Sequence, residues 1–500
     1  MNGIAILGTG SDVGKSFVTT AFCRVLADRG LSVAPFKAQN MSNNAGITRD
    51  GWEIARAQIV QAEAARVEPT PAMNPVLLKP TSSTGAQVIL NGRVAGPHTA
   101  AEYFKDTTRF RVAAMAALDE LRATYPVIVA EGAGSCAEVN LRSRDFTNFD
   151  VAHHADLGVV LVADIDRGGV FAQVAGTLAI LDPHDRARVR GVLINRFRGD
   201  IGLFRDGVDW LEARTGLPVY GVLPYDRTIT IESEDALPPE AVVDPPGVVV
   251  GPGARVRVAV VVTPHIANLT DLQPLMMHPE LEVHWLTRPR DLGAYDLVLL
   301  AGSKNTRRDL EHLRSSGWTD RIHGRHAAGG HLAGICGGYQ MLGLEVADPL
   351  GVEDVSGTTA GLGLLAVRTE FFAEKRLGRS AGRWGDVHVT GYEIHHGRTE
   401  RVGARPAVRI LARPEGPVDE PDGAWSADGR VWGSYLHGIF DTPRAVAAML
   451  QGIRPEVDLS ELAERPSFET VRQQQYDSLA AHLRAYVDVD RIVSDCGIAG

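Results

Sequence analysis

The fold of the first half of the chain is decided by the stretch Gly3-Ile4-Ala5-Ile6-Leu7-Gly8-Thr9-Gly10-Ser11-Asp12-Val13-Gly14-Lys15-Ser16. An apolar run leads into a glycine-rich turn that ends in Gly-Lys-Ser, and residues 17–26 continue with helical spacing. This order predicts a strand, a phosphate-binding loop and a helix whose first N–H groups surround an anion. We expect Lys15 to contact the outer phosphates of a nucleotide and the Ser16 hydroxyl to bind Mg²⁺. The predicted nucleotide-binding residues are Gly8, Thr9, Gly10, Gly14, Lys15 and Ser16.

Short apolar runs that alternate with helix-like segments continue along the first half, for example at residues 127–130, 158–163 and 192–195. Such runs predict a parallel sheet that is covered by helices on both faces. A Pro/Gly-rich segment then interrupts the pattern, which resumes near Val256. The predicted organisation is an ATP domain at 1–235, a linker at 236–254, a second α/β domain at 255–450 and a helical tail at 451–500.

Composition excludes several classes of protein. The 500 residues include 51 Lys+Arg and 61 Asp+Glu, and a net charge of -10 does not favour nucleic acid or an anionic membrane as a partner. The four cysteines are far apart and show no zinc-binding spacing, so we expect reduced thiols. The N-terminus lacks the features of a signal peptide, and no long apolar run follows, which predicts a cytoplasmic protein.

A second motif, Gly334-Ile335-Cys336-Gly337-Gly338-Tyr339-Gln340, follows an apolar run in the second half. A cysteine on a tight strand-to-helix turn is exposed, and the helix start favours its thiolate form. We predict Cys336 as a nucleophile, and such a thiol needs a base; His437 follows a strand-like run about a hundred residues later. The turn that begins with Gly302 and Ser303 follows an apolar run and is well placed to offer backbone N–H groups to a tetrahedral intermediate.

Both motifs resemble those of known families. The extended phosphate loop resembles that of dethiobiotin synthetase, which uses ATP to activate a carboxylate; by this resemblance Lys37 contacts phosphate, and Glu131 and Glu53 hold the metal together with Ser16. Gly10 stands where partition-type ATPases have a signature lysine, which counts against an ATP switch. The cysteine motif is similar to that of triad glutamine amidotransferases, which implies a class I glutamine amidotransferase-like fold for the second domain, so both domains are predicted to be doubly wound. By this resemblance His437 is the base of Cys336, and the oxyanion and glutamine-binding residues are Gly302, Ser303 and Gly337.

The sequence departs from the amidotransferase triad at one position. The triad has a glutamate two residues after the histidine, and this chain has Ile439 there. Either another group orients the imidazole of His437 or the pair works without one. The same departure characterises the amidotransferase branch that contains the cobyric and cobyrinic acid amide synthases.

Residues 35–44, 73–80, 131–135 and 391–395 resemble the cobyric acid synthase family in family order, and the resemblance extends from Met1 to about Phe440. It implies ATP- and glutamine-dependent amidation, with Mg²⁺, of four peripheral carboxylates of adenosylcobyrinic acid a,c-diamide, a corrinoid of cobalamin biosynthesis. The residues predicted to contact phosphate or substrate are Lys37, Gln39, Asn40, Asn43 and Asn44, and Asp166 and Arg167 are weaker candidates.

Two other functions remain open from the sequence. One is the same chemistry on another polycarboxylate, as in cobyrinic acid a,c-diamide synthase or the amidation of a cell-wall precursor. The other is a nucleotide switch or scaffold with a silent glutaminase half, against which the intact Cys336 and His437 count. The histidine pairs His153-His154 and His395-His396 are not interpreted as cobalt ligands, because the corrinoid substrate already carries its metal.

Overall fold

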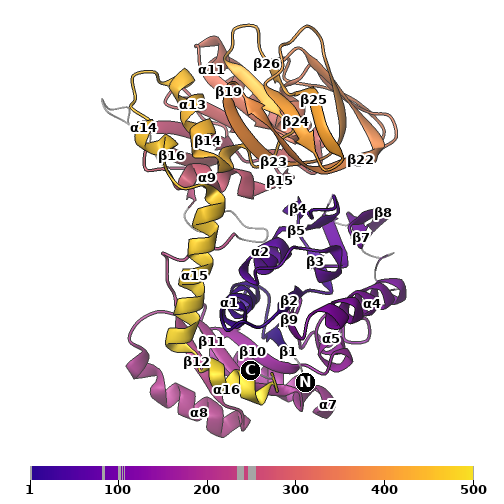
Figure 1. Ribbon diagram of the computed structural model, residues 1–500, viewed down its shortest axis with the longest axis vertical. Helices are drawn as coiled ribbons and strands as arrows, with labels where there is room; N and C mark the ends of the chain where they lie inside the picture. Colours follow the sequence, from indigo (N-terminus) through magenta and orange to yellow (C-terminus); the bar gives the residue numbers. More distant parts are fainter. Residues whose placement is uncertain are drawn as a thin grey trace.

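The computed structural model describes residues 3–80, 85–99, 103, 105, 107–232, 241–245 and 255–498. Two α/β domains lie one above the other, and the long helix α15 (Phe468–Tyr486) runs along one side from the second domain to the first (Figure 1). The predicted α/β class, with a mostly parallel sheet in each half of the chain, is confirmed.

The first domain is built on a parallel sheet with the strand order β12-β11-β10-β1-β9-β2. Its strands are β1 (Gly3–Gly8), β2 (Val33–Phe36), β9 (Val127–Glu131), β10 (Gly158–Asp164), β11 (Val189–Phe197) and β12 (Val219–Pro224). The inner strands are rich in Val, Ile, Leu and Ala and are buried on both faces. Two separate hydrophobic clusters, one on each face, hold the helices against the sheet. The phosphate loop and Glu131 therefore lie together at the carboxyl ends of neighbouring strands β1 and β9.

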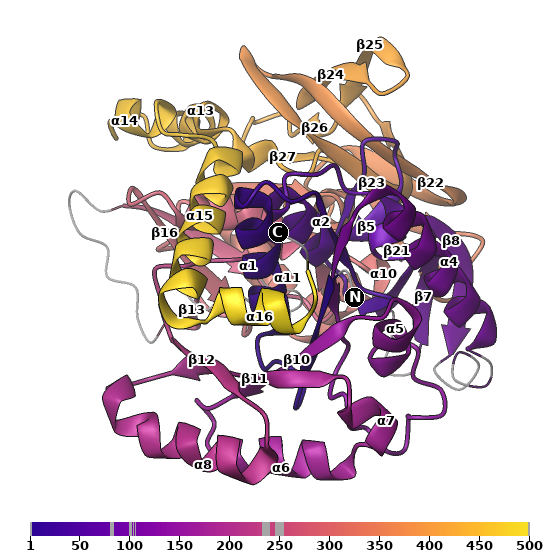
Figure 2. The same ribbon diagram turned by 60° about the horizontal axis from the view of Figure 1, so that its bottom comes forward.

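The helices of the first domain are α1 (Lys15–Asp28), α2 (Arg56–Ala64), α4 (Thr108–Thr124), α5 (Phe149–His154), α6 (Val170–Ile180), α7 (Pro183–Arg186) and α8 (Arg205–Thr215), with 3-10 turns η1 (Pro71–Met73) and η2 (Ile201–Phe204). Figure 2 shows α6 and α8 next to each other below β11 and β12. On the other face, α1 packs with α15, which comes from the far end of the chain.

The segment after β2 leaves the main sheet and forms two small ones. They comprise β3 (Gln39–Met41), β6 (Val76–Pro80), β7 (Gly85–Leu90) and β8 (Arg93–Thr99), and the antiparallel pair β4 (Ala45–Ile47) and β5 (Glu53–Ala55). Glu53 begins strand β5, and the helix α2 starts three residues later at Arg56. The β4–β5 pair faces the second domain, where Ile394 joins its apolar cluster (Figure 1).

The second domain has a mostly parallel sheet with the strand order β13-β16-β14-β17-β19-β27-β26. Its strands are β13 (Val242–Val243), β14 (Val256–Val261), β16 (Leu281–Leu286), β17 (Leu297–Leu300), β19 (His331–Ile335), β26 (Ala424–Trp425) and β27 (Val431–Ser434). Its helices and turns are η3 (Leu269–Leu272), α9 (Gln273–Met276), α10 (Thr306–Ser315), α11 (Trp318–Ala327), α12 (Gly337–Leu342) and η4 (Ile439–Asp441). A short pair of strands, β15 (Ile266–Ala267) and β18 (Gly302–Ser303), lies beside it.

A second sheet in this domain was not predicted. It contains β20 (Glu345–Asp348), β21 (Gly357–Ala360), β22 (Val367–Trp384), β23 (Val387–Arg401), β24 (Val408–Arg413) and β25 (Gly416–Asp422). The long β22–β23 hairpin brings Lys375 and residues 394–396 to the cavity at Cys336. The hairpin therefore forms part of the wall of that cavity.

The predicted linker and tail have the following structure. Within 236–254 the structure describes residues 241–245, where β13 pairs with β16 at the edge of the mostly parallel sheet of the second domain. The rest of the predicted linker lies outside the described residues. The C-terminal helices are α13 (Pro443–Ile453), α14 (Ser460–Ala463), α15 and α16 (Val489–Asp495). Arg24 of α1 is buried and donates to Asp477 and Gln473 of α15. The tail thus returns to the first domain, in agreement with the helix expected there.

In the part of the chain that the structure describes, no helix has the length and apolar character needed to cross a membrane. The cytoplasmic location stays a prediction.

Packing of α15 on the first domain can be tested at Leu479, which is fully buried in the cluster shared with α1. We expect Leu479→Ala to lower the free energy of unfolding of the first domain by about 2–5 kcal/mol, because it removes apolar contacts and leaves a cavity. The matched control is Leu203→Ala, since Leu203 is 86% exposed, and it should change stability by less than about 0.5 kcal/mol. Equal urea midpoints for the two variants would contradict the tight packing of this helix.

Candidate active sites

The phosphate loop is closed by its own lysine. Lys15 Nζ donates to the carbonyl oxygens of Gly10 at 3.0 Å and Gly134 at 2.9 Å. Gly14 has a φ of 93°, and a Cβ there would lie 2.0 Å from the Asn195 side chain, so the turn requires glycine. The loop borders a cavity of about 780 Å³, large enough for a nucleotide.

Glu131 is the carboxylate at this site. It ends β9, is 2% exposed and accepts from the Ser16 hydroxyl at 2.8 Å and from Lys37 Nζ at 2.9 Å. Burial disfavours its charged form, but Lys37 and the two hydrogen bonds outweigh burial and lower its pKa below the ordinary value. The carboxylate therefore stays ionised beside the Ser16 hydroxyl, and this donor pair suits a Mg²⁺ that also binds phosphate oxygens.

The predicted substrate residues separate into two groups. Lys37, Gln39 and Asn40 line the nucleotide cavity, as does Asp166. Asn43 and Asn44 instead reach the second domain, where Asn43 borders the nucleophile cavity. Arg167 is exposed and forms an ion pair with Asp12. Thr9 at the loop donates to Gln173 at 3.4 Å, and the buried Gly8 would clash with Val13 if it carried a side chain.

The metal role predicted for Glu53 does not fit its position. Its carboxylate accepts from Lys79 at 2.8 Å and from Lys375 of the second domain at 2.6 Å, and it does not line the nucleotide cavity. The two lysines outweigh burial and lower the pKa of Glu53. Glu53 is therefore an ion-pair partner at the interface between the domains, whereas Glu131 and Ser16 remain the candidate metal ligands.

Cys336 lies on a strained turn between β19 and α12. Its backbone has φ 51° and ψ -108°, a conformation that is rare for residues other than glycine and typical of a nucleophile elbow. The glycines around it leave room for the neighbouring loop: a Cβ on Gly337 would lie 2.6 Å from the Ser303 nitrogen, and one on Gly338 would lie 1.9 Å from a carbonyl oxygen of β17. The thiol lines a cavity of about 50 Å³ together with Gly302, Ser303 and His437.

His437 is fully buried, and its Nδ1 lies 2.6 Å from Oδ2 of Asp271 in the turn η3. The other Asp271 oxygen accepts from the backbone N–H of Gly438 at 3.1 Å, which fixes the carboxylate beside the ring. Burial opposes a charge on His437, but Asp271 and the Cys336 sulfur outweigh it and raise the pKa of the imidazole to about 10. His437 is therefore an imidazolium near neutral pH. Sequence reasoning missed Asp271.

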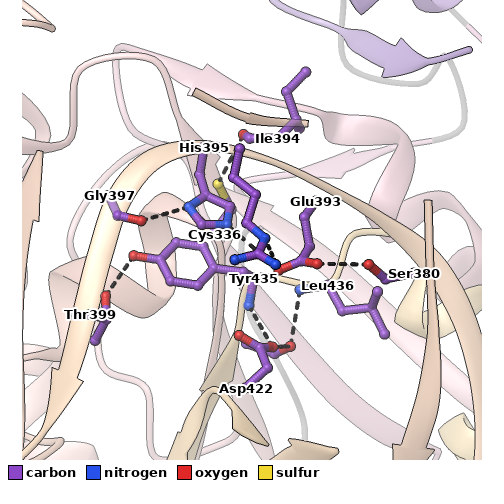
Figure 3. A network of polar contacts seen from close by, with 12 residues as sticks. Cys336, Ser380, Glu393, Ile394, His395, Gly397, Thr399, Asp422, Tyr435 and Leu436 are labelled. Carbon is purple, nitrogen blue, oxygen red and sulfur yellow. Dashed lines mark hydrogen bonds and ion pairs between the residues drawn. The ribbon is translucent and has the colours of Figure 1, made fainter. Parts of the chain in front are cut away.

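A network of polar contacts lies next to Cys336, around His395 and Tyr435 (Figure 3). The Cys336 sulfur faces the carbonyl oxygen of Ile394 at 3.9 Å, and the adjacent His395 stacks on Tyr435 with ring centroids 3.7 Å apart. Tyr435 in turn accepts from Gln340 of the cysteine motif at 3.0 Å. Ile394 and His395 of the motif at 391–395 therefore form one wall of the cavity at Cys336.

The two domains meet within contact distance of His437. The Asn44 side chain accepts from the backbone N–H of Leu269 at 3.1 Å, and the N–H of Ala45 donates to Asn268 at 3.2 Å. Asn268 also lies 3.4 Å from Nδ1 of His437, while Tyr392 stacks on the ring with centroids 5.0 Å apart. The asparagine segment of the first domain (residues 43–45) therefore contacts the turn η3, which carries Asp271.

Comparison with known proteins agrees with both halves of this geometry. Residues 4–238 match the CobQ/CobB/MinD/ParA nucleotide binding domain family, and residues 257–445 match the CobB/CobQ-like glutamine amidotransferase domain family.

Relatives with similarity over the whole chain carry one name. The cobyric acid synthase of Chlorobium phaeobacteroides (strain DSM 266) is 51% identical over 98% of this chain and 96% of its own length. Those of Pelodictyon phaeoclathratiforme and Chlorobaculum tepidum are 52% and 50% identical, over 98% and 100% of this chain and over 96% and 99% of their own lengths. The resemblance inferred from the sequence is confirmed, and the chain belongs to the cobyric acid synthase family, whose members are glutamine amidotransferase ligases.

Proposed function

We propose that the protein amidates four peripheral carboxylates of adenosylcobyrinic acid a,c-diamide to form adenosylcobyric acid, with one glutamine and one ATP for each amide. The observation that carries the proposal is the pairing of two complete sites in one chain. A strained Cys336 beside the His437–Asp271 pair lies against a domain with a phosphate loop and an ionised Glu131. Ammonia release next to carboxylate activation is the chemistry of glutamine-dependent amide synthesis.

In the glutaminase half, the sulfur of Cys336 attacks the side-chain amide carbon of glutamine. The oxygen becomes an oxyanion, for which the backbone N–H groups near Ser303 and Gly337 are the candidate donors. His437 gives its proton to the departing ammonia, and water then hydrolyses the thioester to glutamate and free thiol. Asp271 keeps the imidazole oriented and charged, so it takes the place of the glutamate that Ile439 replaces.

In the ATP half, a substrate carboxylate attacks the γ-phosphoryl group to give an acyl phosphate and ADP, and ammonia then displaces phosphate. Lys15 and Lys37 neutralise charge on the transferred group. Ser16 and Glu131 would hold Mg²⁺, which supplies further charge neutralisation when bound. Gln39 and Asn40 in the same cavity suit the amide and carboxylate arms of a corrinoid, because a side-chain amide both donates and accepts hydrogen bonds.

The alternative substrate is another polycarboxylate, such as cobyrinic acid or a cell-wall precursor. The identity of about 50% to cobyric acid synthases over the whole chain favours the corrinoid diamide.

The role of Cys336 as the nucleophile can be tested by substitution. We expect Cys336→Ala to lower glutamine-dependent amidation of the corrinoid diamide by a factor of about 10³ or more, because the thioester cannot form. Amidation with added ammonium salt should continue, and mass spectra should show successive amide steps. Cys496→Ala, which changes a buried thiol of the tail, is the control and should retain both activities. Loss of both activities in folded Cys336→Ala would contradict two separate sites.

The role of Asp271 can be tested through the pH dependence of glutamine hydrolysis. Burial opposes a charge on His437, but the Asp271 carboxylate and the Cys336 sulfur outweigh it and raise the pKa of the imidazole from 6.5 to about 10, so the imidazolium persists until the pH approaches that value. In Asp271→Asn the larger of the two raising charges is gone, so we expect the alkaline limb of glutamine hydrolysis to move to lower pH and the rate at pH 8 to fall by about 10²–10⁴.

Asp320→Asn is the matched control, since Asp320 is exposed on α11 of the same domain. A pH–rate profile of Asp271→Asn that coincides with that of the control would exclude Asp271 as the group that orients His437.

A further inference from the structure

The imidazole of His437 contacts two uncharged side chains in addition to its partner Asp271. Nδ2 of Asn268 lies 3.4 Å from Nδ1 and 3.5 Å from Nε2 of the ring. The ring of Tyr392 stacks on the imidazole, with the centroids 5.0 Å apart and the planes 14° from parallel. The proton transfer in the proposed mechanism uses neither side chain. Their contacts with a fully buried base therefore indicate a different role.

Tyr392 is held opposite His437 by the main chain. The two residues exchange a pair of backbone hydrogen bonds, in which the N–H of Tyr392 donates at 3.1 Å and the N–H of His437 donates at 2.9 Å. In such an antiparallel bridge the two side chains lie on the same face, which explains the stacked rings. Gly391 allows the close approach, because a Cβ there would lie 1.9 Å from the carbonyl oxygen of His437. The position of the tyrosine ring is thereby linked to that of the imidazole.

One residue of the first domain bonds to both of these side chains. The backbone N–H of Ala45 donates to Oδ1 of Asn268 at 3.2 Å, and the carbonyl oxygen of Ala45 accepts from the hydroxyl of Tyr392 at 3.3 Å. Because the first bond turns the amide oxygen of Asn268 toward Ala45, the amide nitrogen is the atom that faces the ring of His437. The main chain of Ala45 therefore orients both groups that lie against the base.

The surroundings of Ala45 fix its main chain. Ala45 begins β4, is buried and pairs with Ala55 of β5, and Figure 1 shows β4 facing the second domain. The residue before it, Asn44, accepts at its carbonyl oxygen from the N–H of Arg56 at 3.0 Å and at its side chain from the N–H of Leu269 at 3.1 Å. The main chain that reaches the histidine is therefore held by the first domain and by the turn η3 together.

We propose that Asn268 and Tyr392 are positioning residues for the imidazole of His437, and that the main chain of Ala45 holds both of them in place from the first domain. The proposal rests on the proposed role of His437 in glutamine hydrolysis. A base that moves away from the departing nitrogen transfers its proton more slowly, whereas the binding of glutamine does not change. Release of ammonia thereby depends on contact with the domain that consumes it.

The first test uses full-length Tyr392→Phe, which keeps the ring and the backbone bridge but loses the hydrogen bond to Ala45. Glutamate release from glutamine is measured with Mg-ATP and the corrinoid diamide present. We expect kcat to fall by about 3- to 10-fold and KM for glutamine to stay within about twofold, because one buried hydrogen bond that orients the base is lost. Amidation with added ammonium salt should not change.

Tyr486→Phe is the matched control, since Tyr486 is 43% exposed on α15, and it should keep the kcat of the unmodified enzyme. An unchanged kcat in Tyr392→Phe, or a change confined to KM, would overturn the role of Tyr392. An equal loss of glutamine-dependent and ammonia-dependent amidation would also overturn it, because the hydroxyl would then act on the fold or on the amidation step.

The second test removes the other side chain. Asn268 has a φ of 53°, a left-handed conformation that glycine also adopts, so Asn268→Gly does not strain the turn. We expect kcat for glutamate release to fall about tenfold or more with KM within about threefold, because the ring loses its contact and Ala45 loses its acceptor. Asn91→Gly is the matched control, since Asn91 is exposed and has a φ of 47°. The same kcat in both variants would overturn the role of Asn268, and if Asn268→Gly does not fold, Tyr392→Phe decides.

A double-mutant cycle tests the part played by the first domain. Asn44→Ala removes the side-chain bond to Leu269 next to Ala45 and loosens the same contact. We expect Asn44→Ala to lower kcat for glutamate release, and the double variant with Tyr392→Phe to lose less than the product of the two single losses, because both changes break one link. Losses that multiply would overturn the role of Ala45.

The readouts separate this proposal from the proposed function. Glutamate release reports on His437 whether or not the corrinoid is the acceptor. The expected kcat losses without any amidated corrinoid in the unmodified enzyme would contradict the corrinoid function and support the positioning role. Amidated corrinoid together with an unchanged kcat in Tyr392→Phe and Asn268→Gly would do the reverse.

Discussion

The structure depends on the hydrogen bonds that join the asparagine segment of the first domain to the turn η3 of the second. Asn44 and Ala45 bond to Leu269 and Asn268, and the same turn presents Asp271 to His437. Without that contact, Lys304 would lose its hydrogen bond to Gln87, and Lys375 would lose its ion pair with Glu53; both partners belong to the first domain. A buried histidine with a raised pKa and a cavity of buried lysines both require that the interface excludes water.

Hydrogen bonds link the polar segment after β2 to the phosphate loop. Asn40 donates to Gln58, Gln58 to Gln61, and Gln61 to Glu131, which also accepts from Ser16. The candidate metal ligands therefore share one polar network with Asn40, which lies four residues before Asn44 at the interface. The proposed function requires that both an acyl phosphate and ammonia be protected from water, and such a network would favour two sites that face one closed interface.

The sequence predicted the features that local patterns encode. Glycine spacing located the phosphate loop and the Cys336 turn, and the apolar runs located both parallel sheets. Asp271 was missed because it lies 166 positions from His437, and only the fold brings them together. Glu53 was misassigned because its role depends on Lys375, which reaches it from the unpredicted β22–β23 hairpin. The available sequence signal for that hairpin was the alternation of charged with uncharged residues at the start of β22, in Val367-Arg368-Thr369-Glu370-Phe371.

In the proposed function, nitrogen passes from glutamine at Cys336 to a corrinoid carboxylate activated in the other domain. The most direct measurement incubates the enzyme with Mg-ATP, the corrinoid diamide, amide-¹⁵N-glutamine and an excess of unlabelled ammonium salt, and determines the isotope content of the product amides by mass spectrometry. We expect new amides that carry ¹⁵N despite the unlabelled ammonium. Product amides with the isotope content of the bulk ammonium, or a corrinoid without new amides, would contradict it.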